Sequence, residues 1–494
     1  MLVPVYQPLK FNDSMDKSIF LAFLAYFFIL LIIGLLSYRK QHTDSDFIVG
    51  NRSLNFWVIA LSAHASDMSS WLFMAFPAAI MIRGLTQSWI AVGLLLGMFA
   101  NWQFISIPLR TATEKFKAYT LSTFFERRFN DDSGMLRTIT AIISVIFLSC
   151  YLSAGLVALG LVLESVFEIN YYIGLSLATC VVVAYTFIGG FVTVAWTDLF
   201  QALFLLAMII FVPYMAYTHL DQGWHAIVSF ANEKKVDLYF LEDFSIENLL
   251  TILFLVFGWG LGYFGQPHII TKFMGIKHAS EMHKSKYIGM SWMLIALTAS
   301  AAVGLIGIAY FKEGLSNPEL VFVEMVKSLF NPLAAGFILC GMLAAGISTM
   351  DSQMLVCASI LSEDFYKHLI NKRASPQRLL LISRIGVVLI ATVALLIAFN
   401  HSATILDTVQ YAWTGLGAAF GPLVLMSLYS KSANRYGAIG GILCGGLIAG
   451  FWPKLNPLLT QWPIPAMIPG FLAGLLSIYM ISKLILDKSP TAEV

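Results

Sequence analysis

The chain has 494 residues, of which 58% are hydrophobic and only 12% are charged, and its mean hydropathy is +0.78. A soluble protein of this length carries about a quarter charged residues, so this composition excludes an ordinary soluble enzyme. The formal net charge of +2 without a basic cluster predicts no nucleic-acid partner, and five single cysteines without CxxC spacing argue against a metal cluster or disulfide framework.

The apolar runs recur from one end of the chain to the other. Charged residues among positions 1–17 do not suit a cleavable signal peptide, so the first run is expected to stay in the membrane. The runs predict an all-α polytopic membrane protein with about thirteen transmembrane helices, because each is long enough to cross a bilayer. The first six spans are predicted near 18–37, 55–82, 86–110, 136–166, 171–189 and 193–217. The other seven are predicted near 248–268, 284–311, 332–365, 378–399, 403–428, 434–451 and 466–486.

The segments between these spans predict no soluble domain and give an orientation. The longest, near 111–135 and 218–247, are too short for a domain, and "LSTFFERRF" (Leu121–Phe129) predicts a short amphipathic interfacial helix. Of the 30 Lys and Arg residues, 21 fall on one side, 8 on the other and one, Arg384, within a span. The positive-inside rule therefore predicts an external N-terminus and a cytoplasmic C-terminus.

The second span is interrupted by polar residues, in "HASDMSSW" (His64–Trp71). A carboxylate such as Asp67 costs roughly 2.5–3.5 kcal/mol on insertion scales where a helix faces lipid, so a functional role is the default hypothesis. Its neighbours are hydroxyls and backbone carbonyls, which suit a monovalent cation better than zinc or magnesium. His64 is interpreted as a packed or hydrogen-bonded histidine.

The seventh span is interrupted as well, by the glycine-rich "FGWGLGYFGQPH" (Phe257–His268). Glycine weakens a helix by about 1 kcal/mol per position and proline by about 3, and a break in lipid is tolerated only in a polar or buried setting. The two breaks are five spans apart, and an odd offset inverts topology. Paired breaks in oppositely oriented repeats indicate a secondary transporter with its site at the midplane. The alternative is that these glycines serve only close helix packing.

The ninth span offers further oxygens in "LAAGISTMDSQ" (Leu343–Gln353). Ala345, Ser348 and Thr349 are spaced i, i+3 and i+4, so they share one helix face. Two hydroxyls and a carbonyl there can bind a hard cation. The alternative is that both hydroxyls only bond back to carbonyls of their own helix.

Six segments together resemble the sodium:solute symporter family, and within it the sodium/proline symporters. They are "ALSAHASDMSSWLFM", "YTFIGGFVTVAWTD", "GWGLGYFGQPHI", "AAGISTMDSQ", "SEDFYK" and "GLGAAFGP", in this order, and the resemblance covers roughly residues 18–486. It implies a five-plus-five inverted-repeat core of the LeuT type, with repeats at 55–217 and 248–428. The helix at 18–37 and two helices within 434–486 would lie outside this core, in one transmembrane transporter domain.

The resemblance also implies a sodium site and a solute site. Sodium would be bound by the carbonyls of Ala65, Met68 and Ala345 and the hydroxyls of Ser348 and Thr349, with Asp67 as a linked carboxylate. Proline would lie between Ser69, Ser70 and Trp71 on one side and Tyr151, Trp259, Tyr263 and Pro267 on the other. Trp259 and Tyr263 have an alternative place in an interfacial aromatic belt. Other members carry glycine at the positions of His64 and Ser70, so these side chains are expected to add bulk beside the site. Asp198 matches a family carboxylate near the membrane surface and is not expected to bind the ion directly.

The expected activity is sodium-coupled import of L-proline across the cytoplasmic (inner) cell membrane, by a protein that is not an enzyme. No cofactor is expected beyond the co-transported sodium. The expected partners are L-proline, sodium and the lipid bilayer, and no obligate protein partner is expected. A symporter of the same fold for pantothenate, a monocarboxylate, a sugar or another amino acid is the main alternative. A hydrolase built on His64, Asp67 and nearby serines lacks a separate nucleophile and oxyanion partner, and a sensor is not expected because no kinase domain follows Val494.

Overall fold

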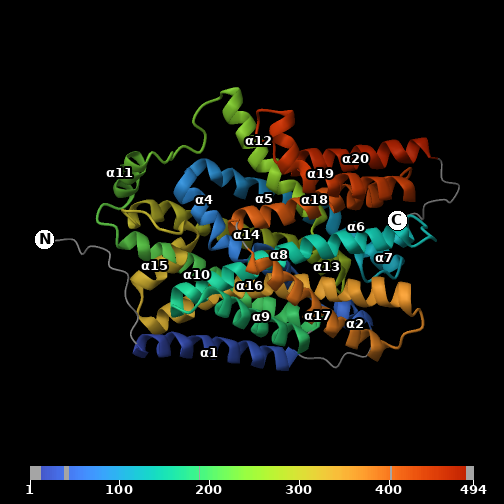
Figure 1. Ribbon diagram of the computed structural model, residues 1–494, viewed down its shortest axis with the longest axis horizontal. Coiled ribbons are helices and arrows are strands. Elements are labelled where there is room, and N and C mark those ends of the chain that lie inside the picture. The colour runs from blue at the N-terminus through green and yellow to red at the C-terminus, as the bar shows by residue number, and fades with distance from the viewer. Residues whose placement is uncertain (1–12, 38–43, 189, 401–402, 486–494) are drawn as a thin grey trace.

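The computed structural model describes residues 13–37, 44–188, 190–400 and 403–485, and these residues form helices and short connections. A single isolated β-bridge, between Leu54 and Ile276, is present in this part of the chain. Most of the long helices run along the long axis of the molecule, with α11 and α15 near one end and α7 near the other (Figure 1).

The helices of the first half are α1 (Asp13–Ser37), α2 (Asp44–Val49), η1 (Gly50–Arg52), α3 (Phe56–Met68), η2 (Ser70–Leu72), α4 (Ala75–Arg83), η3 (Leu85–Ser88), α5 (Trp89–Ala100), η4 (Asn101–Ile105), α6 (Ser106–Lys115), α7 (Leu121–Arg128), α8 (Met135–Phe167), α9 (Tyr171–Ile188), α10 (Phe191–Thr218) and α11 (Trp224–Lys234). Those of the second half are α12 (Ile246–Gly260), η5 (Leu261–Gly265), α13 (Pro267–Met274), η6 (Ala279–Glu281), α14 (Met282–Tyr310), η7 (Pro318–Leu320), α15 (Val321–Leu329), α16 (Pro332–Ser359), η8 (Ile360–Ile370), α17 (Pro376–Phe399), α18 (Ile405–Tyr429), α19 (Arg435–Leu459) and α20 (Met467–Leu484).

A helix lies at the place of every predicted span. In the described part of the chain, eleven helices are long and apolar enough to cross a membrane, and the bent pair Phe56–Met68 and Ser70–Arg83 makes a twelfth. The shorter apolar helix α9 lies where the remaining span is predicted. Two predicted ends are wrong. The twelfth span is predicted to end near 451, whereas α19 continues to Leu459. The seventh is predicted to end near 268, whereas its helix continues through α13 to Met274.

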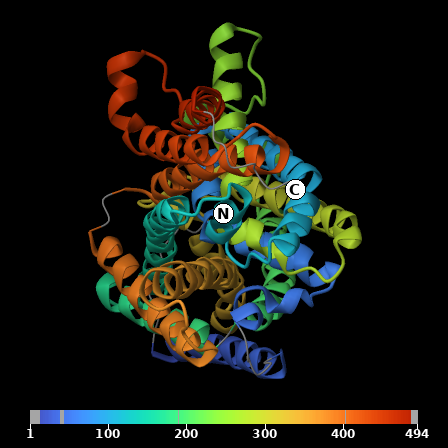
Figure 2. The same cartoon turned by 90° about the vertical axis from the view of Figure 1, so that its right-hand side faces the viewer.

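The central helix of the molecule is α16, and other helices surround it. In its most apolar stretch α16 is 83% buried, and it contacts α3, α8, α10, α13 and α17. The first helix, α1, lies at one margin against α16 and α10, and α19 and α20 lie at the opposite margin, packed on each other and on α18 (Figure 2). The two breaks are therefore enclosed by other helices, whereas much of α12 before its break is exposed.

Glycines allow α5 and α12 to approach closely. A Cβ atom on Gly97 would come within 2.1 Å of the carbonyl oxygen of Gly260, and one on Gly93 within 2.4 Å of that of Val256. Small residues at such contacts let helix backbones meet, as is common in membrane proteins. One helix of this pair, α12, leads directly into the break of the seventh span at η5.

Arginines join the helix ends near α7. Arg52 donates hydrogen bonds to the carbonyls of Met274, Thr113 and Ala118, at 3.0–3.1 Å. Burial, and then the nearby Arg110, lower the pKa of Arg52 to about 10, so it stays protonated at neutral pH. These bonds connect the loop before α3 to the ends of α6 and α13.

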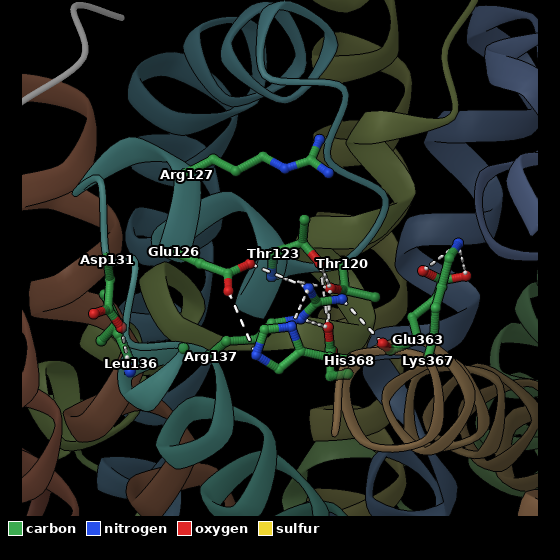
Figure 3. Close-up of polar contacts among 12 residues, drawn as sticks. Thr120, Thr123, Glu126, Arg127, Asp131, Leu136, Arg137, Glu363, Lys367 and His368 are labelled. Carbon is green, nitrogen blue, oxygen red and sulfur yellow. Dashed lines mark hydrogen bonds and ion pairs between the residues drawn. The ribbon is translucent and has the colours of Figure 1, made fainter. Parts of the chain in front are cut away.

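A second cluster of charged residues lies on α7, α8 and η8 (Figure 3). Arg137 forms ion pairs with Asp364 at 2.7 Å and with Glu126 at 3.1 Å, and also bonds the carbonyl of Glu363. Asp364 further accepts from the hydroxyls of Thr120 and Thr123. The short helix predicted at 121–129 is thus present as α7, and this cluster holds it against the end of α16.

Candidate substrate and cation site

The first break lies at Ser69, between α3 and η2. Its backbone has φ +49°, a region that residues other than glycine rarely occupy, and the two halves of the span bend by 67°. The Ser69 N–H donates to the Thr349 hydroxyl at 3.0 Å, and the Ser69 hydroxyl accepts from the N–H of Trp71 at 3.2 Å. A residue of the ninth predicted span therefore stabilises the break in the second.

The second break lies between α12 and α13. The helix narrows to the 3-10 turn η5, Gln266 is extended, and Pro267 begins α13. Gln266 donates from its side-chain amide to the carbonyl of Trp413 at 3.0 Å, and a Cβ on Gly262 would come within 2.0 Å of the Trp413 indole nitrogen. The glycines thus serve close packing against α18 and also lie where the helix is interrupted, so the two interpretations of this stretch hold together.

One hydrogen bond joins the two breaks directly. The Tyr263 hydroxyl donates to a carboxylate oxygen of Asp67 at 2.6 Å. Both side chains are buried, with Asp67 4% and Tyr263 0% exposed. Because a charge-assisted bond in a dry setting is strong, Asp67 and Tyr263 connect the broken helices that the sequence predicts to share a site.

Four of the five oxygens predicted for sodium lie close together. The Ser348 hydroxyl donates to the carbonyl of Ala65 at 2.8 Å and of Ala345 at 3.1 Å, and the Thr349 hydroxyl approaches the same carbonyls at 3.3 and 3.1 Å. Met68, the fifth predicted ligand, is the last residue of α3, directly before the break. Both hydroxyls form hydrogen bonds to a carbonyl of their own helix, α16, as the alternative predicts, but the same hydroxyls also contact a carbonyl of α3. The set is made of uncharged oxygens, which suits a hard monovalent cation.

Three of the four aromatic residues predicted for the solute, Trp71, Trp259 and Tyr263, belong to one buried cluster of rings that also contains Trp413. The ring of Trp71 lies 5.2 Å from that of Trp259 and stacks on Phe76 at 5.0 Å. Tyr263 packs edge-on against Trp413, at 4.9 Å. Trp259 and Tyr263 are 3% and 0% exposed, so an interfacial aromatic belt is the wrong interpretation for them.

The remaining predicted solute residues come from three different elements. Tyr151 lies in the middle of α8 and meets the ring of His268 edge-on at 5.6 Å, next to Pro267. Ser70 faces α16, since a Cβ on Gly346 would lie 2.6 Å from its hydroxyl oxygen. Ser69 lies at the first break, directly before Ser70. Neither Trp413 nor His268 is among the predicted site residues, although His268 lies within the quoted segment "GWGLGYFGQPHI" and Trp413 lies two residues before "GLGAAFGP".

His64 does not lie where the comparison with glycine-bearing members predicts. Its ring packs between Trp102 and Trp292, at 6.1 and 5.8 Å, and its Nε2 accepts from the Trp102 indole N–H at 3.3 Å. A Cβ on Gly289 would come within 2.3 Å of the same atom, so His64 fills a space beside α14. The expectation that it adds bulk beside the site is wrong, and the interpretation as a packed histidine is confirmed.

A buried polar cluster lies next to the oxygens proposed for sodium, and the sequence does not predict it. Asp198 pairs with Lys272 at 2.8 Å and accepts hydrogen bonds from Ser62 and Ser66, and all four are fully or nearly fully buried. The charge count assigned Lys272 to a loop, whereas it lies inside α13. Asp198 lies against α3, where Ser62 and Ser66 donate to its carboxylate. A carboxylate is stable in a buried place only with such partners.

Comparisons with known proteins identify the family and the fold of this chain. The chain matches the sodium:solute symporter family over residues 47–445. It is 40% identical to the high-affinity proline transporter PutP of Bacillus subtilis (strain 168), over 94% of this chain and 97% of that protein. It is 39% identical to the sodium/proline symporter of Salmonella typhimurium (strain LT2), over 97% and 95%.

Among solved structures, a Na+-coupled sialic acid symporter in a substrate-bound outward-open state has a TM-score of 0.80, with 18% identity, and covers 97% of this chain and 99% of that one. MHP1, a nucleobase-cation-symport-1 family transporter, has a TM-score of 0.55 with 15% identity, over 90% of this chain and 97% of that one. These likenesses show the fold, an all-helical transporter fold with an inverted-repeat core of the LeuT type. The family match and the full-length relatives place this chain in the sodium:solute symporter family.

Proposed function

We propose that this protein is a secondary active symporter that imports L-proline together with sodium. One observation carries the proposal: the two broken helices meet each other through Asp67 and Tyr263, and the first also meets α16 through Ser348 and Thr349. An ion bound at α3 and α16 therefore acts directly on the break that forms one wall of the solute site. The names of the relatives, proline transporters and sodium/proline symporters, support proline as the solute.

In this proposal sodium takes the oxygens of Ala65, Met68, Ala345, Ser348 and Thr349. Binding the ion turns both hydroxyl protons away from the Ala65 carbonyl, so their lone pairs face the cation. This ties α3 to α16 and orders Ser69, Ser70 and Trp71. Asp67 holds the break through Tyr263 and lowers the electrostatic energy of a cation nearby.

The solute lies between the first break and the residues Tyr151, Trp259, Tyr263 and Pro267. A pyrrolidine ring with a cationic nitrogen suits tryptophan and tyrosine faces. Its carboxylate meets backbone N–H groups at the start of a half-helix, where the helix dipole favours negative charge. The same elements thus bind both ends of a zwitterion.

Alternating access converts the sodium gradient into a solute gradient. One sodium ion moving through about 100 mV releases roughly 2.3 kcal/mol, and a tenfold sodium gradient adds about 1.4 kcal/mol. With one ion per solute, these energies sustain a solute gradient of several hundredfold. The mechanism needs no cofactor and no further protein.

We further propose that the protein lies in the cytoplasmic membrane with its N-terminus outside and its C-terminus inside. The bias of Lys and Arg toward alternate loops supports this orientation. The two inverted repeats would be 55–217 and 248–428, with helices at 18–37 and within 434–486 outside them. A fluorescent protein fused after Val494 that is protected from external protease would support the orientation, and its removal by that protease would contradict it.

Uptake of radiolabelled L-proline into proteoliposomes tests the function. We expect uptake that depends strongly on an inward sodium gradient and collapses when the gradient is removed. Excess unlabelled pantothenate, lactate, glucose or alanine should leave this uptake unchanged. Strong competition by one of them, or sodium-independent uptake, would contradict the proposal.

A further inference from the structure

A narrow cavity leads away from the proposed solute site toward the end of the molecule that carries α7. It begins at Pro267 and His268 on α13, passes between that helix and Ser352 and Ser359 on α16, and ends at Thr120 at the start of α7. Thr120 is held in place by Asp364 in the charged cluster (Figure 3). In the proposed orientation this is the cytoplasmic side.

His268 lies where the solute site meets this cavity. Its ring is completely buried and packs edge-on against Tyr151, which is one of the proposed solute residues. Neither of its ring nitrogens has a hydrogen-bond partner among the described residues. A buried polar group without a partner costs about 1–3 kcal/mol, so an imidazole in this place calls for a ligand.

The charges on the cavity wall indicate which ligand this is. Lys272 is the only charged side chain that lines the cavity in the described part of the chain, and it lies one helical turn after His268 on α13. Its ammonium group binds Asp198 at 2.8 Å and has further donors. Two nitrogen donors at i and i+4 on one helix face favour an anionic group and disfavour a sodium ion.

The cavity also shows that passage requires movement. It has only about 20 Å³ of room for water, and a single water molecule already needs roughly 10–15 Å³. The whole solute therefore cannot pass until α13 and α16 separate. A carboxylate turned toward His268 would be the first part of the solute to enter as they do.

We propose that His268 forms an inner subsite for the carboxylate of the zwitterionic solute, which the solute occupies on its way to the cytoplasm. The His268 N–H donates to one carboxylate oxygen. The Lys272 ammonium group, one helical turn further along α13 and paired with Asp198, has further N–H donors for the same carboxylate. This inference rests on the proposed function, since it takes an amino or imino acid to be the cargo.

Transport measured separately from each face tests the subsite. The wild type is compared with two variants in right-side-out and everted vesicles. His268→Leu keeps the volume of the side chain but removes both nitrogens, and His268→Gln keeps a hydrogen-bond donor. Hydrogen bonds to charged groups lead us to expect that His268→Leu raises the cytoplasmic KM for proline about tenfold or more. The external KM should change far less, and His268→Gln should restore much of the loss. Thr271→Val is the matched control, since Thr271 lines the same cavity but donates its hydroxyl to the carbonyl of Pro267.

Three outcomes with the variants would overturn the subsite. Equal changes of KM at both faces without rescue by glutamine would mean that His268 only packs. Unchanged KM values for proline at both faces would mean that the carboxylate does not bind His268. A change in sodium activation alone would mean that the cavity binds the ion and not the solute. In the wild type itself, L-prolinamide should compete at the cytoplasmic face far more weakly than proline, and equal competition would also overturn the subsite even if a variant fails to fold. A wild type that takes up no proline would instead refute the proposed function, and this inference with it.

Discussion

The bond between Tyr263 and Asp67 allows a direct test of how the two broken helices are coupled. Tyr263→Phe removes one hydroxyl and leaves the ring packed against Trp413. A buried carboxylate then loses a 2.6 Å hydrogen bond, and such bonds to charged groups contribute about 1.5–3 kcal/mol. If the bond holds both breaks in the form that binds the ion, the sodium concentration for half-maximal uptake should rise about 10- to 150-fold.

The assay is the initial rate of proline uptake in proteoliposomes against sodium concentration, at saturating and at low proline. Tyr310→Phe is the matched control, because it removes a tyrosine hydroxyl whose partner, Ser328, lies in an exposed pair at 2.8 Å. It should change either constant by less than about threefold, as surface substitutions usually do. Asp67→Asn combined with Tyr263→Phe should be clearly non-additive. Normal sodium activation and normal proline KM in Tyr263→Phe would refute the coupling.

Three further changes test the ion site and the packing. Thr349→Ala should weaken sodium activation with little change in folding. The control Thr298→Ala should leave sodium activation unchanged, because the Thr298 hydroxyl bonds only its own helix. Normal transport at low sodium by Thr349→Ala would make the cation-site assignment wrong. Arg137→Ala leaves the buried carboxylate of Asp364 unpaired, so it should cost about 3–5 kcal/mol of stability and lower the thermal unfolding midpoint in detergent; an unchanged midpoint would contradict this. Gly97→Ala places a methyl group against a backbone carbonyl of α12, and overpacking of this kind should cost about 1–3 kcal/mol, visible in the same unfolding assay.

The sequence predicts much of the fold because a bilayer imposes simple local rules. Every predicted span has a helix at its place, since the length and apolarity of each run decide whether it can cross a membrane. The two breaks could also be found, because a carboxylate or a run of glycines in such a run is costly unless something compensates. A hydrogen bond from Tyr263 to Asp67 joins the two breaks in the structure, and the site that they are predicted to share stays a prediction.

The errors lie where a side chain's partner is distant in the sequence. His64 is one turn from Asp67, yet its direction is decided by Trp102, Trp292 and Gly289, which come from other helices. Lys272 looked like a loop lysine because only the folded chain brings Asp198 to it.

Local apolarity, spacing and helix-breaking residues thus determined the class of protein, the place of each helix and the two interruptions. Only the tertiary structure decided which side chains face the ion, the solute or another helix, because those directions depend on contacts between residues 38 to 284 positions apart. The imidazole of His268 shows this well: the sequence places it beside a proline, and the packing of α8, α13 and α16 sets it at the head of a cavity.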